Sequence, residues 1–101
     1  MRTLDFHRAD IERIVLVTEP TDLRNDNIDV WVHLKDGRTF SFTVLTVENL
    51  RSFVSAEGTF ATPGMLVVTE LSDKLIIDAI LEAWQGGIQN FGVLQTGEST
   101  S

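Results

Sequence analysis

The sequence predicts an α+β domain, with a mixed, mainly antiparallel sheet of about four strands and two helices packed on one face of it. Two segments that alternate apolar and polar residues meet at an Asp-Gly pair, which is typical of a β-hairpin. Two later segments repeat apolar residues at helical spacing, and each follows a residue type that caps helices. A nearly all-apolar run lies between them. Together with a β-branched run ahead of the hairpin, these segments predict the order βββαβα.

The first predicted strand is "RIVLVT", Arg13 to Thr18, whose β-branched residues favour extended structure. It is followed by Glu19-Pro20 and the polar stretch "TDLRNDN", which indicate a loop. Asp and Asn are frequent in loops because their side chains bond to nearby backbone groups. The stretch also lacks the acidic spacing of an EF-hand loop, so we expect turns there and no calcium site.

The register of the hairpin "DVWVHLKDGRTFSF" decides which of its side chains are exposed. A two-residue loop at Asp36-Gly37 would mix apolar and polar residues on both faces. A three-residue loop, Lys35 to Gly37 with Gly37 in the left-handed conformation, gathers the apolar residues on one face. This register is favoured because a slip of one residue would turn the whole apolar set outward. The predicted pairs are Leu34 with Arg38, Val32 with Phe40, Val30 with Phe42 and Ile28 with Val44.

The opposite face of the hairpin carries Trp31 and His33, and Ser41 follows on the partner strand among other hydroxyl residues. Three environments are open for Trp31. It could pack across the neighbouring strands. It could lie under the N-terminal segment, which contains Leu4 and Phe6. It could also contact a protein, since tryptophan is enriched at the energetic centres of interfaces.

Thr46 can cap a first helix over Val47 to Glu57, and Gly58 suits the left-handed residue that often follows a helix. After a loop, the segment Met65 to Glu70 is almost entirely apolar. This composition is typical of a strand that is covered on both faces. We therefore place it inside the sheet rather than at an exposed edge.

The last helix is predicted over Asp73 to Gln85, with Ser72 as its cap and Gly86-Gly87 at its end. Its apolar residues cover more of its surface than one sheet face can bury. Either the first helix lies beside it, or a dimer contact through Trp84 and Leu81 covers the remainder. A short edge strand within "IQNFGVLQ" would complete the sheet.

Length and composition indicate a single domain over residues 1–94 and a flexible tail, Gln95 to Ser101, without large apolar side chains. Fifteen acidic against eight basic residues give a net charge of −7. No basic stripe exists, which argues against a nucleic-acid partner. No stretch is apolar enough to span a membrane and no secretory signal is visible, so we expect a cytoplasmic protein without a membrane partner.

The chain has no cysteine, and neither histidine lies at metal-ligand spacing from another strong ligand, so we expect no metal and no cofactor. His33 could act as a base for a nucleophile at Ser41 or Thr39. Asp29 or Asp36 would then orient the imidazole. Because no strained turn or oxyanion site is apparent around them, we assign no catalytic residue and rank a small hydrolase third. The predicted binding residues are Trp31, His33, Ser41 and Trp84.

Three stretches resemble a family of small bacterial α+β proteins of uncharacterised function: "VWVHLKDGRTFSF", "TVENL" at the start of a helix, and "MLVVTELS" running into "DKLIIDAILEAW". These are turn, capping and core signals, so the resemblance implies the fold and carries over no functional residue. The size, acidity and βα make-up are also similar to those of immunity proteins that neutralise bacterial toxins, by analogy of shape and charge.

The leading functional prediction is a non-enzymatic protein-binding module. Acidic loops would attract a basic partner, and Trp31 or Trp84 would anchor the contact. An immunity-type inhibitor of a bacterial toxin is one form of such a module. The alternative is a homo-oligomeric structural or adaptor protein, such as a homodimer, whose exposed apolar faces are covered by self-association.

Overall fold

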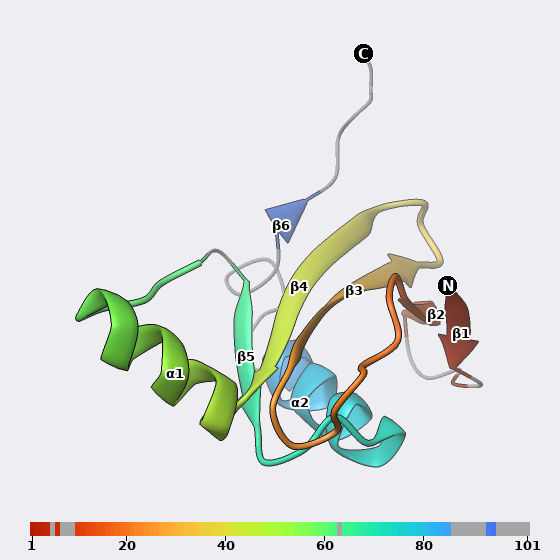
Figure 1. Cartoon of the computed structure of the whole chain (residues 1–101). Helices are drawn as coiled ribbons and strands as arrows, with labels where there is room; N and C mark the ends of the chain where they lie inside the picture. Colours follow the sequence, from red (N-terminus) through yellow and green to blue (C-terminus); the bar gives the residue numbers. More distant parts are fainter. Residues whose placement is uncertain (5, 7–9, 63, 86–92, 95–101) are drawn as a thin grey trace.

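The protein has one mixed β-sheet and two α-helices (Figure 1). The structure is a computed structural model that describes residues 1–4, 6, 10–62, 64–85 and 93–94. The strands follow the order β1-β2-β3-β4-β5, and β6 pairs with β4. The α+β prediction is confirmed, with a further strand at each end of the predicted order. The elements are β1 (Arg2–Leu4), β2 (Ile11–Leu16), β3 (Asn27–Leu34), β4 (Thr39–Thr46), α1 (Val47–Glu57), β5 (Met65–Val68), α2 (Asp73–Gln85) and β6 (Val93–Leu94).

The hairpin of β3 and β4 has the predicted register. Val32 pairs with Phe40, Val30 with Phe42 and Ile28 with Val44. At the turn, the Leu34 N–H donates to the Arg38 carbonyl and the Gly37 N–H donates to the Leu34 carbonyl. Gly37 has a φ of 97°, the left-handed conformation that a three-residue loop with a bulge requires.

The strand before the hairpin begins and ends two residues earlier than predicted, at Ile11 and Leu16. The N-terminal strand β1 was not predicted, and it pairs with β2 so that Leu4 lies opposite Ile14. Leu4 and Phe6 both pack on the main core rather than on Trp31. The two apolar side chains that the sequence analysis offered as a cover for Trp31 are thus part of the core on the other face.

The core lies between one face of the sheet and α2. Apolar side chains from β2, β3 and β4 meet Ile76, Ile80 and Ala83, which recur on one side of the helix. Ser72 caps this helix as predicted, since its Oγ accepts a hydrogen bond from the Leu75 N–H at 3.3 Å. Trp84 and Ile77 pack against the edge of the same core.

Helix α1 has its predicted bounds and caps but not its predicted place. Thr46 Oγ1 accepts the Asn49 N–H at 3.1 Å, and Gly58 has a φ of 82°. None of its residues is buried, and none belongs to the core cluster under α2. Figure 1 shows α1 in front of the β5 edge and α2 behind the sheet. The crossover from β4 through α1 to the parallel strand β5 is right-handed, and that handedness sends α1 to the face opposite α2.

Strand β5 also corrects a prediction. It covers Met65–Val68 and pairs in parallel with β4, but it stands at the end of the strand order rather than inside the sheet. Its apolar composition is explained only in part by burial, because Val68 is buried whereas Val67 is 42% exposed. A run of apolar residues does not distinguish an interior strand from an edge strand that keeps an apolar surface open.

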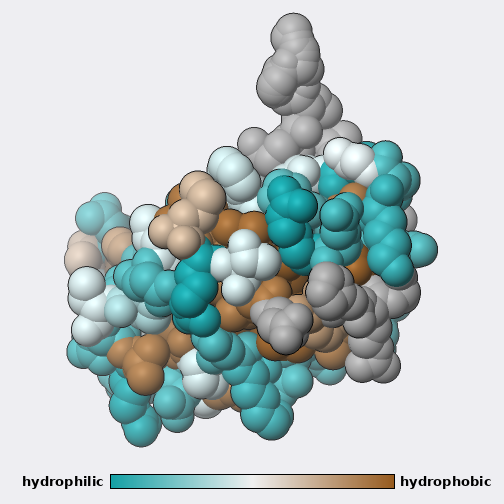
Figure 2. All heavy atoms as spheres, turned by 90° about the vertical axis from the view of Figure 1, so that its right-hand side faces the viewer, coloured by the Kyte–Doolittle hydropathy of each residue, from teal (hydrophilic) through white to brown (hydrophobic). Residues whose placement is uncertain are grey.

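The opposite edge of the sheet is tied to α2 by ion pairs. Arg2 in β1 donates to Glu19 at 2.6 Å and to both carboxylate oxygens of Asp73 at 2.9 Å. The guanidinium holds the pKa of both carboxyls below their usual values, and Asp73 lies at the positive end of the α2 dipole. On this side of the molecule, hydrophilic atoms surround a central apolar area (Figure 2).

None of the helices in the described residues has the length and apolar character needed to cross a membrane. The predicted tail, 95–101, lies outside the described residues, and so does most of the segment in which an edge strand was predicted. Of that segment the structure describes Val93–Leu94, which pair with β4 as β6.

Candidate functional site

The predicted binding residues of the hairpin meet on the sheet face that points away from α2. Because side chains alternate along a strand, the confirmed register places this set opposite the core residues. Strands β2 and β4 supply the cross-strand neighbours. Trp31 lies between Val15 and Ser41, and His33 lies between Arg13 and Thr39. We call this surface the Trp31 face, and define it by Val15, Trp31, His33, Thr39, Ser41 and Thr43.

Trp31 is the central side chain of this face. It is half-buried, while its cross-strand neighbour Val15 is only 5% exposed even though Val15 points away from the main core. The Trp31 ring also meets the His33 ring edge-on, with 6.3 Å between the centroids and 82° between the planes. Trp31 thus packs across the neighbouring strands, which is one of the three environments considered for it, and part of its surface stays exposed.

His33 is held in place by Thr39. Its Nδ1 lies 2.8 Å from Thr39 Oγ1 across the hairpin. The pKa of His33 is lowered, mainly because the ring is partly buried and also because Arg13 lies nearby; Glu12 acts in the opposite direction. The neutral ring is therefore favoured at physiological pH, and the face presents an aromatic pair rather than an extra positive charge.

The carboxylates proposed for a hydrolase are engaged elsewhere. Asp29 accepts a hydrogen bond from Thr43 Oγ1 at 3.5 Å. Asp36 accepts from the Arg38 backbone N–H at 3.0 Å and from its side chain at 2.9 Å. In the described contacts neither orients His33, which a catalytic triad would need. The described contacts therefore do not include the carboxylate–histidine pair of a catalytic triad at this face.

Ser41 is half-buried beside Trp31 and belongs to the Trp31 face. Trp84 does not: it lies on α2, across the sheet from Trp31, and packs against the core. The two tryptophans that the sequence offered as interface anchors are thus on opposite sides of the sheet. Only Trp31 lies on a face that is free of α2.

No cluster of three or more His, Asp or Glu side chains is placed to hold a metal ion in the described part of the chain. The Asp- and Asn-rich loop instead bonds to its own backbone, as the sequence predicted. Asp26 Oδ2 accepts the Thr21 N–H at 2.8 Å, and Asp22 Oδ1 accepts the Arg24 N–H at 2.9 Å. Hydrogen bonds from backbone N–H groups, led by that of Thr21, lower the pKa of Asp26.

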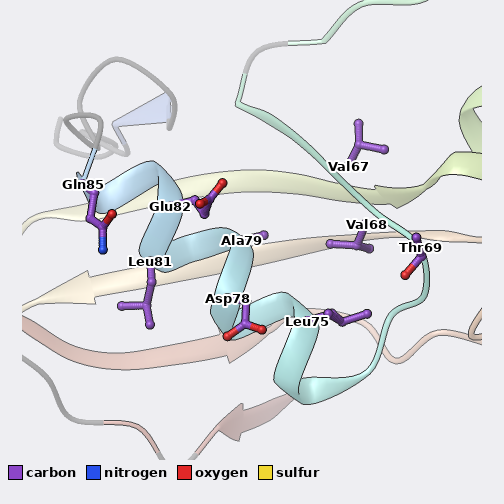
Figure 3. Close-up of a pocket in the computed structure, with 9 residues that line it drawn as sticks. All are labelled: Val67, Val68, Thr69, Leu75, Asp78, Ala79, Leu81, Glu82 and Gln85. Carbon is purple, nitrogen blue, oxygen red and sulfur yellow. The ribbon is translucent and has the colours of Figure 1, made fainter.

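The sequence analysis did not predict another surface feature, an open groove between β5 and α2 (Figure 3). Its lining includes Val68, Leu75, Ala79 and Glu82. The surplus of apolar residues on the last helix was a signal for it. The sequence analysis assigned that signal to the first helix or to a dimer contact through Trp84 and Leu81.

We compared the chain with models of known protein families, with curated proteins and with solved structures, and none of the three comparisons found a match. The functional argument therefore rests on the chemistry of these surfaces.

Proposed function

We propose that this protein is a non-enzymatic protein-binding module and that the Trp31 face is its contact surface. The observation that carries the proposal is a partly exposed tryptophan at the centre of a sheet face that α2 leaves uncovered. Helix α1 packs on β4 and β5 at one end of that face, where Leu45 is fully buried, and its Asn49 accepts a hydrogen bond from Asn27 at the start of β3 at 2.9 Å. Neither of the described helices packs on the β2 and β3 part of this face, which we propose as the contact area.

Trp31 has the properties of an interface anchor. Its contacts with Val15 and His33 hold the indole in place before any partner arrives, so little rotamer entropy remains to be lost on binding. Hydroxyl side chains surround it, including Thr39 and Thr43. A rigid aromatic centre with a polar surround is typical of the residues that dominate binding free energies.

The partner that we propose is a basic protein. The net charge of −7 would attract such a partner over a distance and raise its association rate. An immunity-type inhibitor of a bacterial toxin is the concrete form of this proposal, supported by small size and acidity.

The test replaces Trp31 by Ala. Wild-type and W31A protein are each immobilised and exposed to an extract of the source cells, and proteins retained by wild type are identified and then purified. We expect a basic protein whose Kd rises roughly thirtyfold with W31A, equivalent to about 2 kcal/mol for an interface anchor.

Trp84→Ala is the matched control, because it removes the same side chain from the core side of the sheet. It should lower the melting temperature clearly, with a loss of roughly 2–4 kcal/mol in the free energy of unfolding. The W84A protein that remains folded should still bind the partner through its Trp31 face. W31A should lower the melting temperature much less. Equal binding by wild type and W31A, or equal losses of stability in both variants, would contradict the proposal.

A further inference from the structure

The outer edge of β5 carries backbone groups that pair with no other strand among the described residues. Thr43 N–H donates to the Gly64 carbonyl, so Gly64 faces β4. Alternate residues of a strand direct their N–H and C=O groups to the same side, so Leu66 and Val68 also face β4. Met65 and Val67 then direct theirs away from it, and β5 has no neighbour on that side in the strand order of the described residues. Such an edge is a template for another strand.

On the α2 side of this edge lies the groove of about 560 Å³. In Figure 3, Val68 and Leu75 face each other across it, and Ala79 lines the same side of the helix. Asp78 and Glu82 both line the groove; Glu82 points toward β5, whereas Asp78 points away from it. Asp78 is paired with Lys74 at 2.7 Å, and Glu82 is exposed without a hydrogen bond to a described residue. The groove therefore has an apolar floor and a negative rim.

On the other side of the edge, the side chain of Val67, a residue that also lines the groove, points away from α2 (Figure 3) and is 42% exposed. Helix α1, which contacts β5, carries the exposed residues Val47 and Val54. The open edge thus lies between an acidic groove toward α2 and exposed valine side chains toward α1.

The charge of the surrounding elements is strongly negative. Residues 47–85 contain six acidic and two basic side chains. Both basic side chains are already paired, Arg51 with Glu48 and Lys74 with Asp78. A positively charged occupant therefore fits this edge, whereas a second copy of a chain with a net charge of −7 would bring like charges together.

We propose that the open edge of β5 binds an extended basic segment of a partner protein by strand addition. The N–H and C=O groups of Met65 and Val67 would pair with the segment. Because its side chains alternate, one set would enter the groove and the other would lie toward α1. Lysine or arginine fits the groove, with its methylene chain over Leu75 and Ala79 and its charge beside Glu82. Apolar side chains fit the surface at Val67. This site is separate from the Trp31 face and stands whether or not Trp31 anchors a partner.

The probe is a short synthetic peptide that alternates valine and lysine, titrated into isotope-labelled full-length protein and followed by the backbone amide signals in NMR. We expect saturable shifts at the amides of β5 and of α2 around Ala79. A peptide that alternates valine and glutamate should cause none. Two further peptides carry N-methyl groups on only the valines or only the lysines. Strand addition predicts that only one of these two loses binding, since only alternate N–H groups face β5.

Two variants with the same change of charge test the groove. Glu82→Gln should weaken the peptide a few-fold, as expected for an exposed ion pair. Asp78→Asn, one turn earlier, changes a carboxylate that also lines the groove but is already paired with Lys74, so it should change the affinity less. Neither side chain is buried, so both variants should fold.

Several results would overturn the proposal. These are no shift at β5 with peptide up to about 1 mM, the weak end of specific binding, equal binding of both N-methylated peptides, or equal effects of E82Q and D78N. Shifts at Trp31 and His33 instead of β5 would assign the peptide to the Trp31 face. Concentration-dependent shifts at β5 without peptide would assign the edge to a second copy of this chain.

Discussion

At the scale of single residues, His33 links the geometry of the Trp31 face to pH. Its pKa in the folded protein lies below the ordinary value of about 6.5, first because the ring is partly buried. Below pH 6.5 the unfolded chain therefore binds more protons at this site than the folded protein. The stabilising contribution is fully present above that pH and is lost as the pH falls toward the folded pKa.

We therefore expect the free energy of unfolding to decrease as the pH falls below about 6.5, and His33→Asn to remove that part of the decrease. Urea unfolding of both proteins over a pH series measures it. Losses from carboxylates with lowered pKa values, such as Asp26 and Asp36, occur at lower pH and should persist in both proteins. Identical pH profiles of the unfolding free energy for both proteins around pH 6 would show that folding does not change the pKa of His33, and would contradict the prediction.

At the scale of elements, one buried hydroxyl joins three parts of the chain. Thr46 is the last residue of β4 and the cap of α1, and it is fully buried. Its Oγ1 accepts the Asn49 N–H at 3.1 Å and the Asp26 N–H at 3.4 Å. The end of the strand, the start of the helix and the loop before β3 thus share a single acceptor.

Thr46→Val keeps the shape of the side chain and removes this acceptor. We expect a loss of roughly 1–2 kcal/mol in the free energy of unfolding, as for the removal of a helix cap. Denaturant unfolding measures it. Thr43→Val is the matched control on the same strand, because its hydroxyl makes only a 3.5 Å contact with Asp29 and is half-buried. Equal losses in the two variants would mean that the cap contributes little.

At the scale of the whole molecule, charge argues for a single copy in solution. A net charge of −7 and the acidic rim of the β5 edge oppose pairing between copies. Trp84, which the sequence analysis assigned with Leu81 to a possible dimer contact, packs against the core of its own chain. The apolar surface left open is therefore smaller than the sequence suggested.

We expect light scattering after size-exclusion chromatography to give the monomer mass across a wide concentration range, at low and at high salt. Salt screens exposed charges, so comparison of the two conditions separates repulsion from the lack of a fitting surface. A stable dimer in both conditions would favour the homo-oligomeric alternative and would direct attention to the β5 edge.

Local patterns determined most of the elements. The Asp36-Gly37 turn and the alternation around it specified the hairpin register, because any slip would expose a whole apolar set. Thr46, Gly58 and Ser72 marked helix ends because each satisfies backbone groups near its own position in the chain. These interactions span few residues, so they are readable without knowing the rest of the fold. Trp31, His33 and Ser41 were placed together for the same reason.

Long-range placement was decided only by the tertiary structure. The sequence could not show that α1 crosses to the face opposite α2, that Trp84 turns toward the core, or that β5 ends the sheet. The physical reason is that an apolar side chain has the same composition whether a helix, a strand or a partner covers it. Which surface remains open depends on the handedness of the crossover and the order of the strands. By itself the sequence determined the hairpin, the caps and the acidity, whereas the separation of the Trp31 face from the β5 edge came from packing.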